Sequence, residues 1–400
     1  MTPLSIDEAI TCTRASVGYV DNVAGKWFSV AANKPRRSDK GLLVEEARTN
    51  VLTNSAVQGA VLGSPGTLPT GWAFASTAGL TQTIVATGVE NGVEYVDIRL
   101  SGTTTGDNIY LQMNGAHSAG LTAQRWQMSA FCKLVAGSLA NVVGFGTIIN
   151  EYTAALAFIQ SDTFGFGASV PTSTLTRYVS STLTSGGATT AYLLPYLWFP
   201  VTNGQAVDFT VRIGWPQFEL GSFPTSPIRT TTVAVTRAAD NNEVNFPELI
   251  VDENECTLFC DVTQLYSNAG GALWGTIFGW ASDPGIGWHS YVIVVDQSDF
   301  PRAEGYSGQP SGIQIQNLLN STVGTTRFKC AAAAEANNAR AALDGVLSTL
   351  DSSCMMPVGT PTYLTVGYAP WDWDWFNGYI HKVRCLPRRA TDAELQSMTE

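Results

Sequence analysis

A short aromatic and acidic segment near the C-terminus holds the best candidates for binding chemistry. Tryptophan occupies every second position from 371 to 375, and aspartate fills the positions between. In an extended strand the tryptophans would share one face and the aspartates the other. Aromatic rings stack on the apolar faces of sugars, and carboxylates accept hydrogen bonds from hydroxyls. We therefore expect a ligand-binding site formed by Trp371, Asp372, Trp373, Asp374, Trp375, Trp288 and His289.

The alternative for this tryptophan row is burial in a core or against another subunit, because tryptophan is more often buried than exposed. The segment does not follow a calcium loop, since Phe376 stands where a ligand is required and Asn377 where glycine is. The histidines at 117, 289 and 381 are far apart and form no metal-ligand pattern. We predict no metal site and no cofactor.

The sequence also lacks a convincing catalytic pattern. Glycosidases need two carboxylates about 5–9 Å apart. Glu253 and Glu255 would share a strand face, but a solvated loop before Cys256 is the simpler interpretation. No G-x-S-x-G elbow, C-x-x-C pair or phosphate-binding loop is present. We expect no catalytic residues and no enzymatic activity.

The composition indicates which elements must position these residues. Hydrophobic residues make up 44% of the 400 residues and charged residues only 14%, with 38 glycines and 18 prolines. Few charges and many turn-forming residues are typical of all-β domains. In Val207–Trp215 the side chains of Phe209, Val211, Ile213 and Trp215 alternate with polar ones, which predicts a strand with one buried face. We predict two antiparallel β-sandwiches.

The charge balance and the apolar runs exclude two classes of partner. The formal net charge is −11, and the longest basic cluster lies between Lys34 and Lys40. Nucleic-acid binding is therefore not expected. The longest apolar run, Ala191–Val201, contains two prolines and is too short to cross a membrane, so we expect no membrane insertion. Residues 1–13 do not have the pattern of a secretory signal, which predicts synthesis in a cytosol.

Turn signals divide the chain into three parts. We expect an N-terminal attachment or linker segment at 1–50, a first sandwich at 51–240 that ends in an extended connector from Pro216 to Asp240, and a second sandwich at 241–400. A capping box formed by Thr391 and Glu394 predicts a short terminal helix. Ala331–Leu343 has helical propensity, but Asn337-Asn338 permits a hairpin turn instead.

The seven cysteines are an odd number, and six of them lie in strand-like stretches. Cytosolic synthesis favours free thiols. Cys256 and Cys260 would lie on the same face of one strand, about 13 Å apart, and cannot bond each other. A Cys260–Cys385 bond is conceivable if the first and last strands of the second sandwich pair, but core packing is the preferred interpretation.

Four stretches of the sequence form a recognisable set: Arg14-Ala15-Ser16 with Tyr19, the run GLLVEEARTN at 41–50, QFELGSFPTS at 217–226 and TRAAD at 236–240. Together they resemble segments of bacteriophage tail and fibre proteins. The resemblance implies a carbohydrate-binding-module-like jelly roll for the central part. The later residues resemble a concanavalin A-like, laminin-G-like sandwich, on the basis of Cys256–Phe259, Lys329 to Gly345, Phe376–Ile380 and Pro387–Leu395. This resemblance favours the hairpin over the helix at 331–343.

The resemblance implies a non-enzymatic virion protein, such as a tail fibre, a spike or a capsid decoration, that is made in the host cytoplasm. The implied partners are other virion proteins, further copies of the chain in a homotrimer, and a host-surface glycan bound during host attachment. Two other functions remain open. One is a carbohydrate-active enzyme or its accessory binding module, and the other is a decoration without a ligand.

Overall fold

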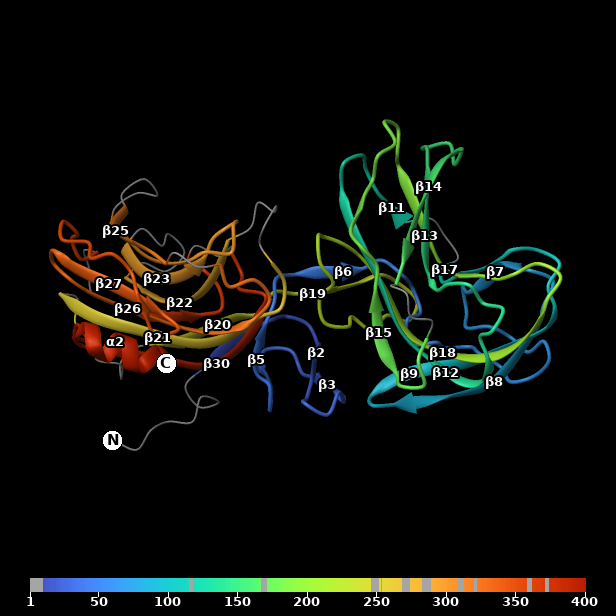
Figure 1. Cartoon of the computed structure of the whole chain (residues 1–400), viewed down its shortest axis with the longest axis horizontal. Coiled ribbons are helices and arrows are strands. Elements are labelled where there is room, and N and C mark those ends of the chain that lie inside the picture. The colour runs from blue at the N-terminus through green and yellow to red at the C-terminus, as the bar shows by residue number, and fades with distance from the viewer. Residues whose placement is uncertain are drawn as a thin grey trace. The chain divides into compact units, whose positions relative to one another are not determined.

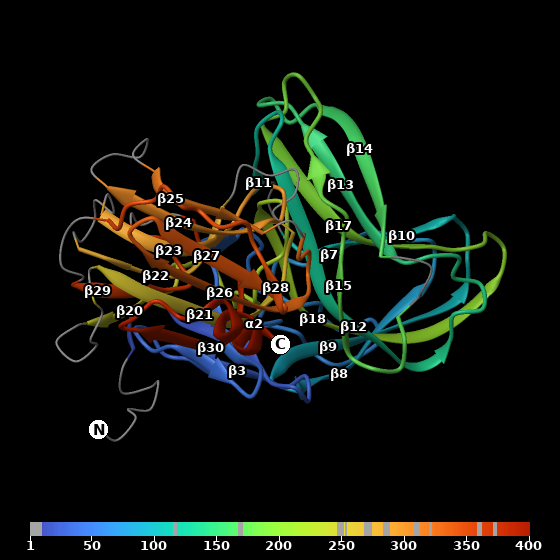
Figure 2. The ribbon, with the colours of Figure 1, turned by 60° about the vertical axis from the view of Figure 1, so that its left-hand side comes forward.

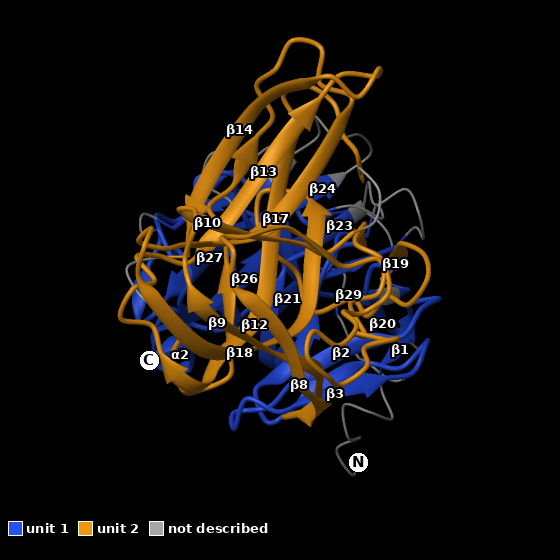
Figure 3. Cartoon of the chain, turned by 90° about the vertical axis from the view of Figure 1, so that its right-hand side faces the viewer, with its two compact units in different colours: residues 1–47, 237–400 blue, residues 48–236 orange. Residues whose placement is uncertain are grey.

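The computed structural model describes residues 10–114, 118–166, 171–245, 252, 254–267, 274–282, 289–307, 313–319, 322–357, 362–370 and 374–400. Two compact units divide the chain: residues 1–47 and 237–400 form unit 1, and residues 48–236 form unit 2 (Figure 3). Antiparallel sheets build both units, and in the described part the only helix is α2 (Asp392–Thr399). The all-β prediction is confirmed.

Unit 2 contains two sheets (Figure 1). One has the order β14 (Phe158–Gly165), β13 (Gly146–Tyr152), β17 (Tyr192–Pro200), β10 (Asn108–Gln112) and β7 (Ala73–Thr77), with β11 (Ser118–Ala119) beside β17. The other has the order β15 (Thr176–Val179), β12 (Arg125–Ser138), β18 (Ala206–Leu220), β9 (Val93–Thr103) and β8 (Thr81–Glu90), with β16 (Leu183–Thr184) beside β12. The short strands β6 (Arg48–Asn50) and β19 (Val235–Arg237) also pair.

The alternation predicted for β18 is confirmed over most of its length. Phe209, Val211 and Ile213 are at most 2% exposed and join the core between the two sheets. Trp215 is the exception, because its φ of +38° coincides with a register shift between β12 and β18. Its ring packs edge-on against Phe131 instead, with ring centroids 6.3 Å apart.

The segment after β18 is not the extended connector that its proline and threonine content predicts. β18 continues to Leu220, and Gln217 and Glu219 are buried within it. The Glu219 carboxylate accepts hydrogen bonds from the backbone and hydroxyl of Thr225, and the Ile228 N–H donates to Gln217. These polar side chains satisfy the irregular backbone that follows, so the stretch packs as part of unit 2.

Unit 1 contains two larger sheets and a hairpin. The first sheet has the order β1 (Thr11–Thr13), β20 (Asn241–Asn245), β29 (Tyr363–Val366), β22 (Gly275–Ala281), β23 (His289–Val295), β24 (Pro301–Ser307) and β25 (Ile313–Leu318). The second has the order β28 (Val346–Leu347), β27 (Asn338–Leu343), β26 (Arg327–Glu335), β21 (Glu255–Gln264), β30 (Gly378–Leu386), β5 (Gly41–Val44) and β4 (Arg36–Ser38). The hairpin pairs β2 (Gly18–Asp21) with β3 (Trp27–Val30).

The N-terminal segment is part of unit 1, and the prediction of a separate attachment or linker segment is wrong for its described residues. β1 pairs with β20, and β5 pairs with β30. Leu42 and Val44 are at most 1% exposed and lie in the core of the unit. The segment is too short for a core of its own. It is ordered because it extends two sheets whose other strands come from much later in the chain.

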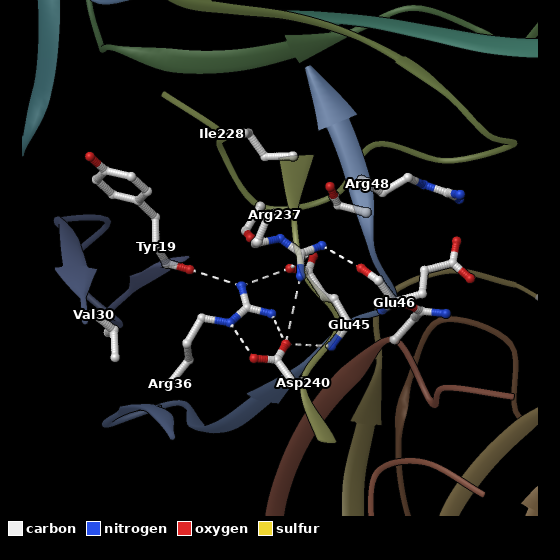
Figure 4. A network of polar contacts seen from close by, with 12 residues as sticks. Tyr19, Val30, Arg36, Glu45, Glu46, Arg48, Ile228, Arg237 and Asp240 are labelled. Carbon is white, nitrogen blue, oxygen red and sulfur yellow. Dashed lines mark hydrogen bonds and ion pairs between the residues drawn. The ribbon is translucent and has the colours of Figure 1, made fainter. Parts of the chain in front are cut away.

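A buried cluster of charges holds this segment in unit 1 (Figure 4). We call Arg14, Arg36, Glu45, Arg237 and Asp240 the arginine cluster; each side chain is at most 1% exposed. The Asp240 carboxylate accepts hydrogen bonds from Arg14 at 2.8 Å, from Arg36 at 3.1 Å and from the Glu45 N–H at 3.0 Å.

Three of the sequence stretches that resemble phage proteins thus meet inside unit 1, through Arg14, through Glu45 of 41–50 and through Arg237 and Asp240 of 236–240. Arg36 also bonds Glu45 at 2.8 Å and the Tyr19 carbonyl at 3.0 Å, and Arg237 donates to the Glu46 carbonyl at 2.7 Å. Although burial alone would lower it, the carboxylates of Asp240 and Glu45 raise the pKa of Arg36. Buried charges are tolerated where they are paired in this way. The arginine cluster therefore stabilises the packing of the N-terminal segment of unit 1 against the part of unit 1 that begins at residue 237.

Two local predictions for unit 1 are confirmed. Residues 331–343 form the hairpin of β26 and β27 rather than a helix. Helix α2 begins with the expected capping box, in which Thr391 and Glu394 exchange hydrogen bonds. The helix covers β26 and β27 through Leu395, which packs with Ala331 and Ala342 (Figure 1).

The turn of this hairpin leads to a stability prediction. Asn337 has a φ of +59°, a left-handed conformation that asparagine tolerates and β-branched residues do not. We expect Asn337→Val to lower the free energy of unfolding of unit 1 by about 1–2 kcal/mol. Asn337→Gly should leave the free energy of unfolding within a few tenths of a kcal/mol of the value for the parent chain. Denaturant unfolding measures both, and an Asn337→Val variant as stable as Asn337→Gly would contradict the assignment.

All seven cysteines are free thiols, and six lie in strands. Cys385 lies opposite Leu258, and Cys260 lies opposite Cys330, so the register does not bring Cys260 and Cys385 together. Burial raises the pKa of Cys12 to about 11 and that of Cys385 to about 12. These thiols are therefore protonated and act as small apolar side chains. Among the described residues, no helix has the length and apolar character needed to cross a membrane.

Candidate functional site

An aromatic surface covers the outer face of one sheet in unit 2. Leu193, Leu197 and Phe199 of β17 are at most 1% exposed and point into the core. Because side chains alternate along a strand, Tyr192, Tyr196 and Trp198 project from the opposite face. We call the set Tyr110, Tyr152, Tyr192, Tyr196 and Trp198 the aromatic face.

The register of three adjacent strands brings these rings together. Tyr110 of β10 lies opposite Trp198, and Tyr152 of β13 lies opposite Tyr192. Tyr196 lies between the two pairs on β17, and its ring centroid is 6.0 Å from that of Tyr110. Figure 2 shows β14, β13 and β17 side by side. The five rings therefore form a continuous strip along β17.

Amide side chains orient the rings of the aromatic face. The indole N–H of Trp198 donates to the Asn108 side-chain oxygen at 2.7 Å. The Asn150 amide donates to the Tyr152 hydroxyl at 3.3 Å, and its oxygen accepts from Ser161 at 2.7 Å. Gln112 lies opposite Tyr196. The two hydrogen bonds hold the rings of Trp198 and Tyr152 in fixed positions, which lowers the entropy lost when a ligand binds.

The exposure of the rings and the ionisation state of their hydroxyls determine which ligands the aromatic face can bind. Tyr110, Tyr152, Tyr192 and Trp198 are partly exposed, and Tyr196 is 8% exposed. Burial and the neighbouring Tyr152 raise the pKa of Tyr196 to about 12, and burial raises the pKa of Tyr110. Both hydroxyls are thus neutral donors and acceptors at physiological pH. Such a surface can stack on sugar rings and exchange hydrogen bonds with their hydroxyls.

The same sheet contains a pair of carboxylates, but on its inner face. Glu151 is fully buried and accepts hydrogen bonds from the backbone of Gly186 at 3.0 Å, from that of Gly187 at 3.1 Å and from the Thr190 hydroxyl. Burial opposes ionisation, but these donors hold the pKa of Glu151 below its usual range. The bonds tie the chain around residues 186–190 to β13, so the role of this carboxylate is structural.

Asp162 is the second member of this pair and provides a pH test. Burial and the nearby Glu151 raise the pKa of Asp162, so this carboxyl binds a proton more readily in the folded chain. As the pH rises through the folded pKa of such a group, its deprotonation lowers the free energy of unfolding, and this decrease is complete at neutral pH. We expect Asp162→Asn to raise the melting temperature of unit 2 at neutral pH, with no gain in acid. A gain that persisted in acid would contradict this assignment, and Asp208→Asn, at an exposed site, is the control.

The segment predicted from sequence is only partly within the described residues. Trp371, Asp372, Trp373 and Trp288 lie outside them, and for His289 only its backbone position at the start of β23 is described. Asp374 has a φ of +69°, which interrupts the extended geometry assumed for the tryptophan row. Trp375 donates its indole N–H to Asn241 at 3.0 Å and packs against the core of unit 1. Sugar binding by this segment stays a prediction.

The remaining sequence candidates have structural contacts where they are described. Glu253 and His117 lie outside the described residues. Glu255 accepts a hydrogen bond from the Arg389 N–H at 2.9 Å, and His381 bonds Thr263 at 2.8 Å from within β30. Burial and the Arg327 charge lower the pKa of His381. Across the described ranges, no group of three or more His, Cys, Asp and Glu side chains could hold a metal ion.

The sequence interpretation missed the aromatic face. The run from Ala191 to Val201 contains Tyr192, Tyr196 and Trp198, but large apolar residues occupy both faces of this strand. A period of two is therefore hidden in the pattern of hydrophobic and polar residues. One signal in the sequence could have revealed it. The aromatic residues with a polar group, Tyr192, Tyr196 and Trp198, stand at even-numbered positions, whereas the fully apolar Leu193, Leu197 and Phe199 stand at odd-numbered ones.

Comparisons with known proteins concern the fold only. No protein family and no curated protein matches the sequence. Among solved structures, CBM40 of the Ruminococcus gnavus IT-sialidase is 12% identical and covers 37% of this chain and 84% of its own, with a TM-score of 0.31. Mouse laminin α1 domains LG4-5 are 10% identical and cover 69% of this chain and 89% of their own, with a TM-score of 0.25.

A tandem of two CBM22 domains from Paenibacillus barcinonensis Xyn10C is a third similar structure. It is 10% identical and covers 82% of this chain and 99% of its own, with a TM-score of 0.27. These TM-scores are too low to transfer a site or an activity to this chain.

Proposed function

We propose that this chain is a non-enzymatic, glycan-binding protein of a bacteriophage virion, and that unit 2 binds the glycan through the aromatic face. The observation that carries the proposal is the strip of rings along β17, in which Tyr196 is buried and the other four rings are partly exposed, flanked by the amides Asn108, Gln112 and Asn150. Fixed aromatic rings with adjacent amides provide the stacking and the hydrogen bonds that a sugar requires. The described part of this face offers no carboxylate pair for hydrolysis.

The virion assignment is supported by the sequence resemblance. The stretches 41–50 and 236–240, which resemble tail and fibre proteins, contribute Glu45, Arg237 and Asp240 to the arginine cluster. In such a particle the partners are other virion proteins, further copies of the chain in a homotrimer, and a glycan on the host surface. Labelling the chain in particle images tests this part, and finding it only as a free monomer in infected cells would contradict it.

Glycan binding is tested with the full-length chain. The chain is applied to an array of bacterial surface polysaccharides, and bound glycans are then incubated with it and examined for shortened products. Binding without products supports the proposal. Shortened products would favour the carbohydrate-active enzyme instead, and an array without any bound glycan would leave a decoration without a ligand.

A matched pair of variants separates the two candidate surfaces. Tyr110→Ala with Trp198→Ala alters the aromatic face of unit 2, whereas Trp371→Ala with Trp373→Ala alters the predicted segment of unit 1. We expect binding to be lost in the first pair and kept in the second. The reverse result would transfer the site to the segment at 371–375.

A further inference from the structure

The outer face of the β14–β13–β17–β10–β7 sheet carries no charge at any position that the strand pairing directs outward. The paired positions on this side alternate with the core residues of the same strands. The outward residues are Phe158, Ser161, Thr163, Gly165, Gly146, Ile148, Asn150, Tyr152, Ala119, Tyr192, Leu194, Tyr196, Trp198, Pro200, Asn108, Tyr110, Gln112, Ser76 and Ala73. Aspartate, glutamate, lysine, arginine and histidine are absent from this set.

An uncharged sheet face contrasts with the other sheet of unit 2. There the outward residues of β9, β12 and β18 include Arg212, which bonds Asp97 at 2.8 Å and Glu90, while Lys133 bonds Glu90 at 2.8 Å. Polar side chains, charged ones among them, usually occupy the solvated face of a sheet. The absence of charged side chains beside the aromatic strip therefore points to a ligand that does not need a charged partner.

The electrostatics of the chain favour the same class of ligand. The formal net charge of −11 repels polyanions as they approach. The described strand positions of this face provide no cation to compensate the carboxylate of an acidic sugar, and a carboxylate that loses water without a partner binds poorly. The amides of Asn108, Gln112 and Asn150 can both donate to and accept from neutral hydroxyls.

The length of the strip indicates more than one sugar ring. Side chains on one strand face repeat every two residues, or about 6.7 Å, so Tyr192 and Trp198 are separated by about 20 Å along β17. Tyr196 lies between them, and Tyr110 and Tyr152 widen the strip on the neighbouring strands. A single sugar ring covers one aromatic side chain, whereas a linear oligosaccharide can cover several in succession.

From these observations we infer that the aromatic face binds an extended stretch of an uncharged polysaccharide, laid along β17. This inference rests on the proposed function and specifies its ligand. Such a ligand differs from α2,3 sialyllactose, to which CBM40 of the Ruminococcus gnavus IT-sialidase is bound in one solved structure, because sialic acid carries a carboxylate. Binding should depend on stacking and neutral hydrogen bonds and change little with salt.

The test uses the full-length chain and two matched sets of probes. Galactan, mannan and dextran are the neutral set, and polygalacturonate, polysialic acid and dextran sulfate are the acidic set. A ladder of oligosaccharides from the best neutral binder measures the effect of length. We expect neutral binding that weakens by about tenfold or more with the shortest oligosaccharides and that persists at high salt.

Each other outcome has a separate meaning. Acidic polymers that bind through the same face, with binding lost in Trp198→Ala, would overturn the inference about charge and leave the proposed function intact. A monosaccharide that binds as tightly as the longest oligosaccharide would overturn the extended mode. Binding of neutral polymers that Trp198→Ala and Tyr110→Ala leave unchanged, or no binding to any probe, would overturn the proposed function itself.

Discussion

Replacing Asp240 with alanine is expected to unfold unit 1 while unit 2 remains folded. Asp240 accepts hydrogen bonds from Arg14, Arg36 and the Glu45 backbone, and these groups are fully buried. Without it, Arg36 and Arg237 keep Glu45 as a carboxylate partner, and Arg14 loses its 2.8 Å bond to a carboxylate. Removing one partner from a buried ion pair costs about 3–5 kcal/mol. That loss reaches the lower end of the stability of whole domains, which is about 5–15 kcal/mol.

Hydrogen exchange reports the stability of each unit separately in this experiment. In Asp240→Ala, amide protection should fall in β5, β21 and β30, which belong to unit 1, and be kept in β12 and β18 of unit 2. Asp39→Ala is the matched control, because Asp39 is an exposed aspartate of unit 1 that accepts a hydrogen bond from the Val23 N–H. If both variants keep their protection, the arginine cluster does not hold unit 1 together.

Replacing Trp198 with alanine is expected to reduce glycan affinity by at least about tenfold without unfolding unit 2. An aromatic anchor commonly contributes about 2 kcal/mol or more to binding, which corresponds to a factor of about 30. Trp198 is partly exposed, and its backbone pairing with Tyr110 does not depend on the side chain. The removed indole also leaves Asn108 without its 2.7 Å donor, which loosens the neighbouring amide.

Titration calorimetry with the best-binding polysaccharide measures this loss, and an unchanged melting temperature of unit 2 shows that the fold is intact. Trp198→Phe should recover part of the affinity, because it keeps an aromatic ring but not the indole N–H. Phe28→Ala is the control, since Phe28 is an exposed aromatic residue on β3 of unit 1. Equal affinity of Trp198→Ala and the parent chain would exclude the aromatic face as the site.

Local patterns predicted much of the fold, and long-range pairing explains what they missed. The strand through Phe209, Val211 and Ile213, the hairpin around Asn337 and the capping box at Thr391 each depend on residues close in sequence. The position of Leu42 and Val44 beside β30 depends on partners near the other end of the chain. Nothing in the local composition of residues 1–50 contains that information.

The candidate site was harder to predict for a related reason. The tryptophan row at 371–375 assumed an extended strand, and the left-handed Asp374 interrupts it. In β17, by contrast, the strand is regular, but both of its faces carry large apolar side chains. Only the packing of Leu193, Leu197 and Phe199 into the core decides that Tyr196 and Trp198 point outward. The sequence alone identifies the aromatic residues but not the face of the strand from which they project.

The division of unit 1 into two stretches of sequence has a consequence for synthesis on the ribosome. Residues 10–47 leave the exit tunnel before unit 2, yet β20 and β30, which pair with β1 and β5, are translated only after the whole of unit 2. Unit 2 is continuous and can fold while translation proceeds. Until β20 and β30 emerge, the N-terminal strands have unpaired edges that can aggregate. Holdase chaperones should therefore bind the nascent chain in this interval, with residues 10–47 as their target.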